Sequence, residues 1–98
     1  MVVISRRQVI RAASAHYRGK ALAERWHDVV TNLSAGSLEE LQRTFPSAAQ
    51  VGNTVVFKIA GNNYRLLCCV DWVWQRLFFR AFLPRDQYDR MNVEDLCP

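Results

Sequence analysis

Apolar residues recur every three to four positions in the first third of the chain, which is the spacing of an amphipathic helix. Residues 2–4 form a short apolar run that predicts an opening strand. Ser5 then stands where a helix N-cap is expected, ahead of a helix predicted over residues 6–15. A second helix is predicted over residues 20–33. The apolar stripes of these two helices consist of Val9, Ile10 and Ala13, and of Leu22, Trp26, Val29, Val30 and Leu33.

A third, short helix is indicated by a capping-box pattern. Glu40 follows Ser37 at the spacing that lets each side chain bond to backbone amides of the first helical turn. The helix is expected to run to about residue 43 and to stop before Pro46, because the residue before a proline disfavours helical backbone.

The pattern changes to alternation after Pro46, where β-branched and aromatic residues become frequent. Gly61, Asn62 and Asn63 separate two such runs and are typical of a tight turn. Pro84 ends the third run. The predicted strands cover residues 54–59, 64–70 and 76–82, and a last helical turn is predicted over residues 86–91.

Together these elements predict one α+β domain that covers residues 1–98. An N-terminal strand and two to three helices would pack on an antiparallel β-meander. At 98 residues the chain is too short for two independent cores. We expect the helices to cover one face of the sheet, and the other face to remain partly in contact with solvent.

Alternation along each strand assigns side chains to the two faces of the sheet. The solvent-facing side is expected to carry Lys58 and Arg80, and Arg65 as well if the strand register allows it. On the third strand, strict alternation groups Arg76, Phe78, Arg80 and Phe82 on one face, opposite Leu77, Phe79 and Ala81.

The charge balance favours an anionic partner. The net charge is +4 at pH 7, and Lys20 and Lys58 are the only lysines among the 13 cationic residues. Arginine binds phosphate oxygens in pairs and does not deprotonate. This balance is typical of a protein that binds nucleic acid or an acidic protein, and equally of a solvated basic surface.

The cysteines and histidines do not indicate a metal or cofactor site. Cys68, Cys69 and Cys97 lack metal-ligand spacing, and neither His16 nor His27 has a companion ligand nearby in sequence. We expect reduced cysteines that pack as small core residues. The chain has no apolar run of about 18 residues and no signal-peptide pattern. No membrane association and a cytoplasmic location are therefore expected.

Seven short motifs follow one another through the chain. They are Trp26, Phe45-Pro46-Ser47, Val55-Val56-Phe57, Gly61-Asn62, Tyr64-Arg65-Leu66, Phe79-Arg80 and Tyr88-Asp89. Each is weak alone, but in this order and spacing they closely resemble the HigB family of bacterial toxins, which belongs to the RelE-like superfamily. The resemblance implies a toxin of a type II toxin–antitoxin module with a RelE-like fold.

The resemblance also implies a metal-independent endoribonuclease that needs no cofactor and inhibits translation and growth. Such toxins typically cleave mRNA in a translating ribosome, against 16S rRNA. The ribose 2′-hydroxyl attacks the adjacent phosphodiester, so the protein must orient that oxygen, stabilise charge on the phosphate and assist proton transfer. The implied partner is a HigA-like antitoxin with a helix-turn-helix domain, and operator DNA would be reached only through this antitoxin.

Four residues are candidate catalytic groups by their position in the motifs. Arg65 and Arg80 match the family's strand arginines and would clamp the scissile phosphate. Tyr88 matches a tyrosine near the C-terminus that stacks on a base or assists proton transfer, and Asp89 would hold the local backbone or an arginine. Lys58 is the fourth candidate, at a position where the family often has asparagine or aspartate.

The sequence departs from the family where a proton carrier is expected. A threonine-histidine pair commonly precedes the Tyr-Asp motif, and Pro84 and Arg85 stand in its place. Histidine titrates near neutral pH, whereas arginine stabilises charge but does not serve as a base. A lysine desolvated beside arginines can act as a base. The acid–base role has therefore either moved to Lys58 and Tyr88 or been lost.

Further candidates are RNA contacts, and each has a structural alternative. The set is Arg76, Arg85, Asn62, Trp72 and Trp74. The two tryptophans flank a predicted hairpin turn, where they form either a satellite cluster or an anchor for antitoxin or ribosomal RNA. Asn62 is first a turn residue.

The catalytic candidates have structural alternatives too. Arg80 is either functional or a cation spread over aromatic surface, and Arg65 equally fits an ion pair with Asp71 or Asp89. Tyr88 fits a lid over the core as well as a catalytic group.

Three functions compete. The first is an mRNA-cleaving toxin. The second is a catalytically weakened relative that binds ribosome, RNA or antitoxin without cleaving, which the missing histidine supports. The third is a gyrase-poisoning toxin of the same superfamily, against which the cations Lys58, Arg65 and Arg80 count.

Overall fold

The computed structural model describes residues 1–97, and its first two helices lie where the sequence predicts them. Helix α1 spans Arg6–Ala13, and the Ser5 hydroxyl caps it by accepting a hydrogen bond from the Gln8 amide at 3.3 Å. Helix α2 spans Gly19–Thr31. Both predictions are confirmed, although each helix ends slightly earlier than expected.

The short third helix has the predicted cap. Helix α3 spans Leu38–Leu41, and the Ser37 hydroxyl accepts a hydrogen bond from the Glu40 amide at 3.3 Å. In return, the Glu40 carboxylate accepts a hydrogen bond from the amide of Gly36 at 2.8 Å. The two bonds satisfy amides that would otherwise lack partners at the start of the helix.

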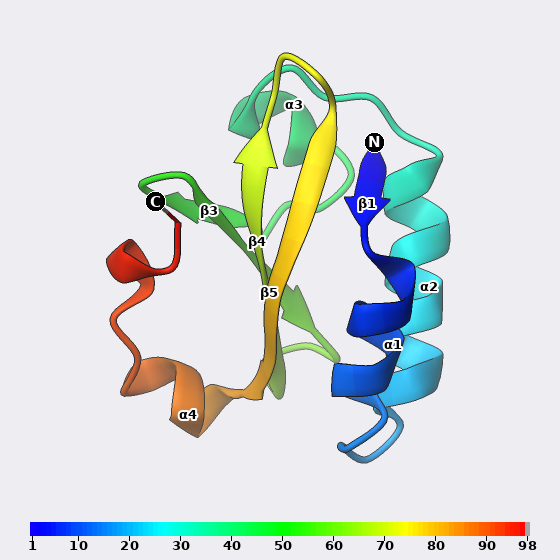
Figure 1. The fold of residues 1–98 in the computed structure, drawn as a ribbon, viewed down its shortest axis with the longest axis vertical. Coiled ribbons are helices and arrows are strands. Elements are labelled where there is room, and N and C mark those ends of the chain that lie inside the picture. Colours follow the sequence, from blue (N-terminus) through cyan, green and yellow to red (C-terminus); the bar gives the residue numbers. More distant parts are fainter. Residues whose placement is uncertain (98) are drawn as a thin grey trace.

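Five strands form one mixed sheet in the order β1-β5-β4-β3-β2 (Figure 1). Strand β1 pairs in parallel with β5, and the other neighbours pair antiparallel. The predicted meander is therefore confirmed. The strands span Val2–Ile4 (β1), Ala49–Val51 (β2), Thr54–Ile59 (β3), Tyr64–Asp71 (β4) and Arg76–Pro84 (β5).

Strand β2 is an addition that hydrophobic alternation does not reveal, because it has only three residues. It forms a hairpin with β3 through Gly52 and Asn53. Gly52 has a φ of 59°, a left-handed conformation that glycine adopts without steric cost. A Gly-Asn pair between apolar residues is a hairpin signal that could have predicted this strand.

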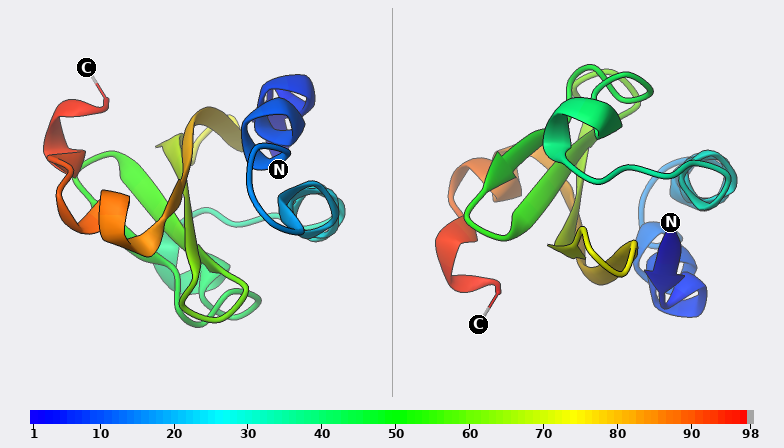
Figure 2. Two further views of the ribbon diagram at one scale, coloured as in Figure 1. Left: turned by 90° about the horizontal axis from the view of Figure 1, so that it is seen from below. Right: turned by 90° about the horizontal axis from the view of Figure 1, so that it is seen from above.

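The sheet is covered on both faces (Figures 1 and 2). Helices α1 and α2 lie against one face. The C-terminal segment, residues 85–97, lies against the other and contains helix α4 (Arg85–Asp89) and the short 3-10 helix η1 (Val93–Asp95). The expected solvent-facing side is thus only partly correct, because a segment with no long periodic pattern covers much of it.

The main core lies between the helices and the sheet. Trp26 of α2 packs edge-on against Phe57 with ring centroids 5.3 Å apart, and Phe45 packs against the same ring at 5.1 Å. The inward side chains of the meander complete this core, and they include Val55, Phe57, Ile59, Leu66, Cys68, Leu77, Phe79 and Phe82.

A smaller apolar cluster joins the C-terminal segment to the second face of the sheet. Val56 of β3 and Leu67 of β4 are buried with Val93 of η1. Tyr88, Met91 and Leu96 of the segment pack around them, together with Val51, Ala81 and Leu83 of the sheet.

A β-bulge corrects the predicted faces of β5. The register shifts between Leu67 and Cys68 of β4, which pair with Ala81 and Phe79, and leaves Arg80 without a partner. After the extra residue the alternation is inverted, so Phe82 points into the main core and is 3% exposed. The prediction that Phe82 shares a face with Arg80 is therefore wrong.

The expected state of the cysteines is also corrected. Cys69 of β4 and Cys97 form a disulfide, with their Cα atoms 5.8 Å apart. Cys68 alone is free and buried, and its burial raises the pKa of the thiol. The disulfide attaches the end of the C-terminal segment to the middle of the sheet.

Gly19 tests the contact between α1 and α2. A Cβ atom at this position would collide with the carbonyl oxygen of Ala13, whereas a Cβ at Gly36 would meet nothing closer than 3.8 Å. We expect Gly19→Ala to lower the free energy of unfolding by about 1–3 kcal/mol, because backbone atoms cannot move aside cheaply. Urea unfolding measures this, with Gly36→Ala as the matched control. Equal stability of the two variants would contradict the close packing.

The disulfide makes a second prediction about stability. The bridge closes a loop between cysteines separated by 28 positions. Reduction should lower the free energy of unfolding by about 3 kcal/mol, because it restores freedom to the unfolded chain. Denaturant unfolding with and without reductant measures the change. Cys97→Ser should match the reduced protein and should not respond to reductant, and a response of that variant would contradict the pairing.

Candidate nucleic-acid interface

The cations of the sheet and the C-terminal segment differ in whether they have a carboxylate partner. Arg76 pairs with Asp71 at 3.1 Å, and two longer contacts join Arg85 to Asp89 at 3.8 Å and Arg90 to Asp86 at 3.9 Å. Within the described chain, residues 1–97, Lys58 and Arg80 have no carboxylate within 4.0 Å, and both are exposed. Among the cations of the sheet and the C-terminal segment, these two are therefore the most available to an anion.

Arg80 is presented by the bulge of β5. Its Nε donates a hydrogen bond to the Sγ of Cys69 at 3.2 Å, and this contact fixes the base of the guanidinium. The two terminal nitrogens donate to no other residue of the described chain. They border a pocket of about 270 Å³ on the second face of the sheet. Arg80 is therefore held in place with its outer edge available for phosphate oxygens.

Arg65 has a different environment from Arg80. It is only 5% exposed, and its guanidinium donates to the Asn62 side-chain oxygen at 2.6 Å and to two backbone carbonyls at 3.1 Å. The ring of Tyr88 lies 5.6 Å from the guanidinium carbon. Neither Asp71 nor Asp89 pairs with it. Arg65 thus fastens the β3–β4 turn and supports Tyr88.

Lys58 lies beside Arg65 in the sheet, where the two residues are register partners. It borders a second hollow of about 290 Å³ between α2 and β3, with Arg25 and Trp26 on the opposite wall. With strands about 4.8 Å apart and a rise of about 3.3 Å per residue, the Cα atoms of Lys58 and Arg80 are roughly 13 Å apart. Two long side chains can span the phosphates of one short RNA segment across this distance.

Tyr88 of α4 connects the C-terminal segment to this region. Its ring packs against the smaller apolar cluster and over Arg65. Its hydroxyl makes no hydrogen bond within residues 1–97. The structure therefore supports the lid interpretation for the ring and leaves the hydroxyl free for a substrate.

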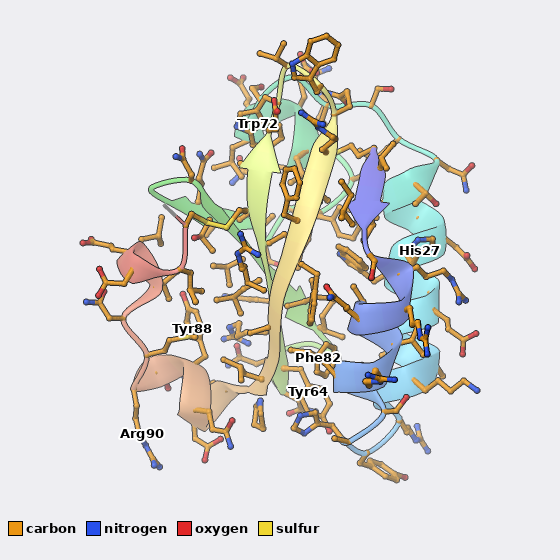
Figure 3. All side chains as sticks on the ribbon, in the orientation of Figure 1. His27, Tyr64, Trp72, Phe82, Tyr88 and Arg90 are labelled. Atoms are coloured by element: carbon orange, nitrogen blue, oxygen red, sulfur yellow. A yellow bond between two sulfur atoms is a disulfide. The ribbon has the colours of Figure 1, made fainter. Side chains whose placement is uncertain are left out.

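The two tryptophans of the hairpin lie far from Tyr88. Figure 3 shows Trp72 at one end of the molecule and Tyr88 towards the other. Trp72 packs against the main core, while Trp74 is 69% exposed. The Trp74 amide donates to the Asp71 carboxylate at 3.1 Å, and this bond, together with Arg76, lowers the pKa of that carboxyl. The structure does not bring the tryptophans together with Arg80.

The histidines do not supply the missing proton carrier. His16 packs between Tyr64 and Phe82, with ring centroids 5.5 and 5.6 Å away, on the helical side of the sheet. His27 lies on α2, where burial and the nearby Arg6 lower its pKa. Arg85, at the family's histidine position, is exposed beside Asp89.

Sequence reasoning missed two residues that the fold places beside Arg80. Asn53 and Phe78 line the 270 Å³ pocket with Val70 and the disulfide. Phe78 could have been found, since it alternates with Arg80 along the strand. Asn53 could not have been found in this way, because its position beside Arg80 depends on the β2–β3 hairpin, and strand β2 was not predicted.

The described residues contain neither a metal-binding cluster nor a membrane-spanning helix. Among the described residues, no cluster of three or more His, Cys, Asp or Glu side chains is arranged to hold a metal ion. No helix within residues 1–97 has the length and apolar character needed to cross a membrane.

Comparison with known families agrees with the sequence motifs. A family model described as HigB toxin, the RelE-like toxic component of a toxin–antitoxin system, matches residues 20–91. The match confirms the resemblance and spans α2 to the end of α4. No curated protein sequence matches the chain significantly.

Arg65 allows a test of its structural role. Arg65→Ala removes three hydrogen bonds and the contact with Tyr88, so we expect the free energy of unfolding to fall by about 2–4 kcal/mol. Arg85→Ala, which removes an exposed pair, should change it by less than about 1 kcal/mol. Thermal or urea unfolding measures both. An Arg65→Ala protein with the same free energy of unfolding as wild type would contradict this structural role.

Proposed function

We propose that this chain, which belongs to the HigB family of RelE-like toxins of toxin–antitoxin systems, is an endoribonuclease that cleaves mRNA. The observation that carries the proposal is the pair of exposed cations, Lys58 and Arg80, that lack carboxylate partners on a sheet whose other strand arginines are engaged. Cations without partners attract the phosphate backbone and stabilise charge that develops on it.

The proposed reaction uses the ribose 2′-hydroxyl as nucleophile. Its oxygen forms a bond to the adjacent phosphorus while the bond to the 5′-oxygen of the next nucleotide breaks, which leaves a 2′,3′-cyclic phosphate and a 5′-hydroxyl. Arg80 binds the phosphate oxygens. Lys58 and Tyr88 carry the two proton transfers, and Arg65 acts as a positioning residue beneath Tyr88.

The proposed activity and the family together indicate the binding partners. The substrate is mRNA, bound in a translating ribosome against 16S rRNA, and cleavage there stops translation and growth in the cytoplasm. The family implies an antitoxin partner. We propose a HigA-like antitoxin with a helix-turn-helix domain, which links the toxin to operator DNA. The proposed reaction uses no metal, since Arg80 supplies the positive charge at the phosphate and Lys58 and Tyr88 supply the proton transfers.

A second candidate function is binding without cleavage. It is favoured by one observation: neither His16 nor His27 lies on the Arg80 face of the sheet, and Arg85 replaces the family's histidine. A protein with cations but no effective proton carrier would occupy the ribosome and block translation without cutting mRNA.

Mapping of mRNA 5′ ends after brief induction separates the two functions. Wild type should create new 5′ ends, and Arg80→Ala should reduce kcat/KM on ribosome-bound mRNA by about 10²–10³, because a charge-stabilising donor is lost. Lys58→Ala should reduce it as well. A 2′-deoxy substitution at the cleaved nucleotide should abolish cleavage, because the attacking hydroxyl is then missing.

Arg90→Ala is the matched control, because Arg90 is an exposed arginine on the C-terminal segment with only a 3.9 Å pair to Asp86. It should cleave as wild type does. Growth arrest by wild type without any new 5′ ends would favour the binding function. Cleavage that persists in both Arg80→Ala and Lys58→Ala would refute the assignment of the site.

A further inference from the structure

The pocket beside Arg80 combines three different recognition groups. A guanidinium edge, the Phe78 ring and the Asn53 amide line one hollow of about 270 Å³. Arg80 and Phe78 come from β5, and Asn53 comes from the turn between β2 and β3. Phe78 is the register partner of Cys69, and the Asn53 carbonyl accepts a hydrogen bond from the Val70 amide at 2.9 Å. Backbone pairing within the sheet thus fixes the relative positions of these groups.

Each group is held in place but keeps its binding surface. The guanidinium carbon of Arg76 lies 5.6 Å from the centre of the Phe78 ring and orders it. Arg80 is anchored through Nε to Cys69. The Asn53 side-chain amide makes no hydrogen bond to any described residue, 1–97, and Asn53 is exposed. A ligand in the pocket would meet one aromatic ring, one cationic edge and one free amide.

This combination matches a single nucleotide of single-stranded RNA. Unstacked bases bind by stacking on aromatic rings and by hydrogen bonds from their edges, while arginine holds the phosphate. An asparagine amide offers a donor and an acceptor side by side, which a base edge can meet with two bonds. Pockets for drug-sized ligands have volumes of about 300–1,000 Å³. The volume of this pocket lies just below that range, which suits a single base.

An acidic or apolar protein segment fits this pocket less well. Among residues 1–97, no acidic side chain lines it, and the free polar groups there are one amide and one guanidinium. A single carboxylate side chain can pair with the guanidinium but offers no donor to the amide oxygen of Asn53, whereas a nucleotide offers a phosphate and a base edge with both donors and acceptors.

We propose that Asn53 and Phe78 form the base pocket of the Arg80 site and determine which nucleotide is preferred next to the cleaved bond. The inference rests on the proposed ribonuclease function. Phe78 supplies affinity for any base by stacking, and Asn53 discriminates among bases by the pattern of donors and acceptors on their edges.

Cleavage of programmed ribosomes that differ in one codon position tests this assignment. Asn53→Leu should reduce the ratio between the best and worst base by about tenfold, because a branched apolar side chain of similar size cannot bond to a base edge. Phe78→Ala should raise KM about tenfold for all bases with little change in kcat, and Phe78→Trp should restore KM. Asn32→Leu is the control and should retain wild-type selectivity, because Asn32 is the exposed C-cap of α2, which lies against the opposite face of the sheet.

Direct binding gives a readout that does not depend on cleavage. NMR titration with short oligonucleotides that carry a 2′-deoxy group should shift the Asn53 and Phe78 resonances. Cleavage with unchanged base selectivity in Asn53→Leu and unchanged KM in Phe78→Ala refutes the pocket and leaves the ribonuclease standing. Absence of cleavage with shifted resonances refutes the ribonuclease and supports the pocket. Variants that weaken only antitoxin binding would reassign the pocket to a protein partner.

Discussion

Strand β4 is covered on both faces, and the positions of the accessible cations depend on this constraint. Leu66 and Cys68 point towards α1 and α2, while Leu67 and Cys69 point towards the C-terminal segment. A cation on such a strand must bury its charge and find hydrogen bonds inside the protein, as Arg65 does near the start of β4. The exposed cations of the sheet strands, Lys58 and Arg80, lie instead on β3 and β5, on either side of β4.

The elements that rest on local signals could be predicted from the sequence. Helix caps at Ser5 and Ser37, the alternating runs and the turn at Gly61-Asn62 each depend only on residues close by in the sequence. The features that could not be predicted depend on partners far along the chain. The bulge at Arg80 reflects the register of β4 against β5, and the Cys69–Cys97 bridge requires the segment to fold back over the sheet. No local pattern encodes either pairing.

The two strand arginines show why a motif position does not by itself assign a role. Arg65 and Arg80 both match the family motifs, yet one has its donors engaged by a turn and the other has a free guanidinium edge. Arg80 points away from the main core by ordinary alternation with Phe79, and at the bulge it has no pairing partner on β4. Arg65, in contrast, pairs with Leu83 in the regular part of the sheet. The geometry gives Arg80 the contact with phosphate, and gives Arg65 the support of Tyr88.

The absence of an imidazole from this face affects the rate of a reaction more than the binding of RNA. Charge stabilisation by one positioned donor is worth about 10²–10³ in rate, and proton transfer by a side chain about 10²–10⁴. These contributions come from different atoms. Arg80 and Phe78 can hold a nucleotide whatever group carries the proton, whereas cleavage also requires Tyr88 or Lys58 to reach the reacting oxygens. The replacement of histidine by Arg85 therefore affects the rate of cleavage, whereas Arg80 and Phe78 on the bulged strand β5 affect which RNA is bound.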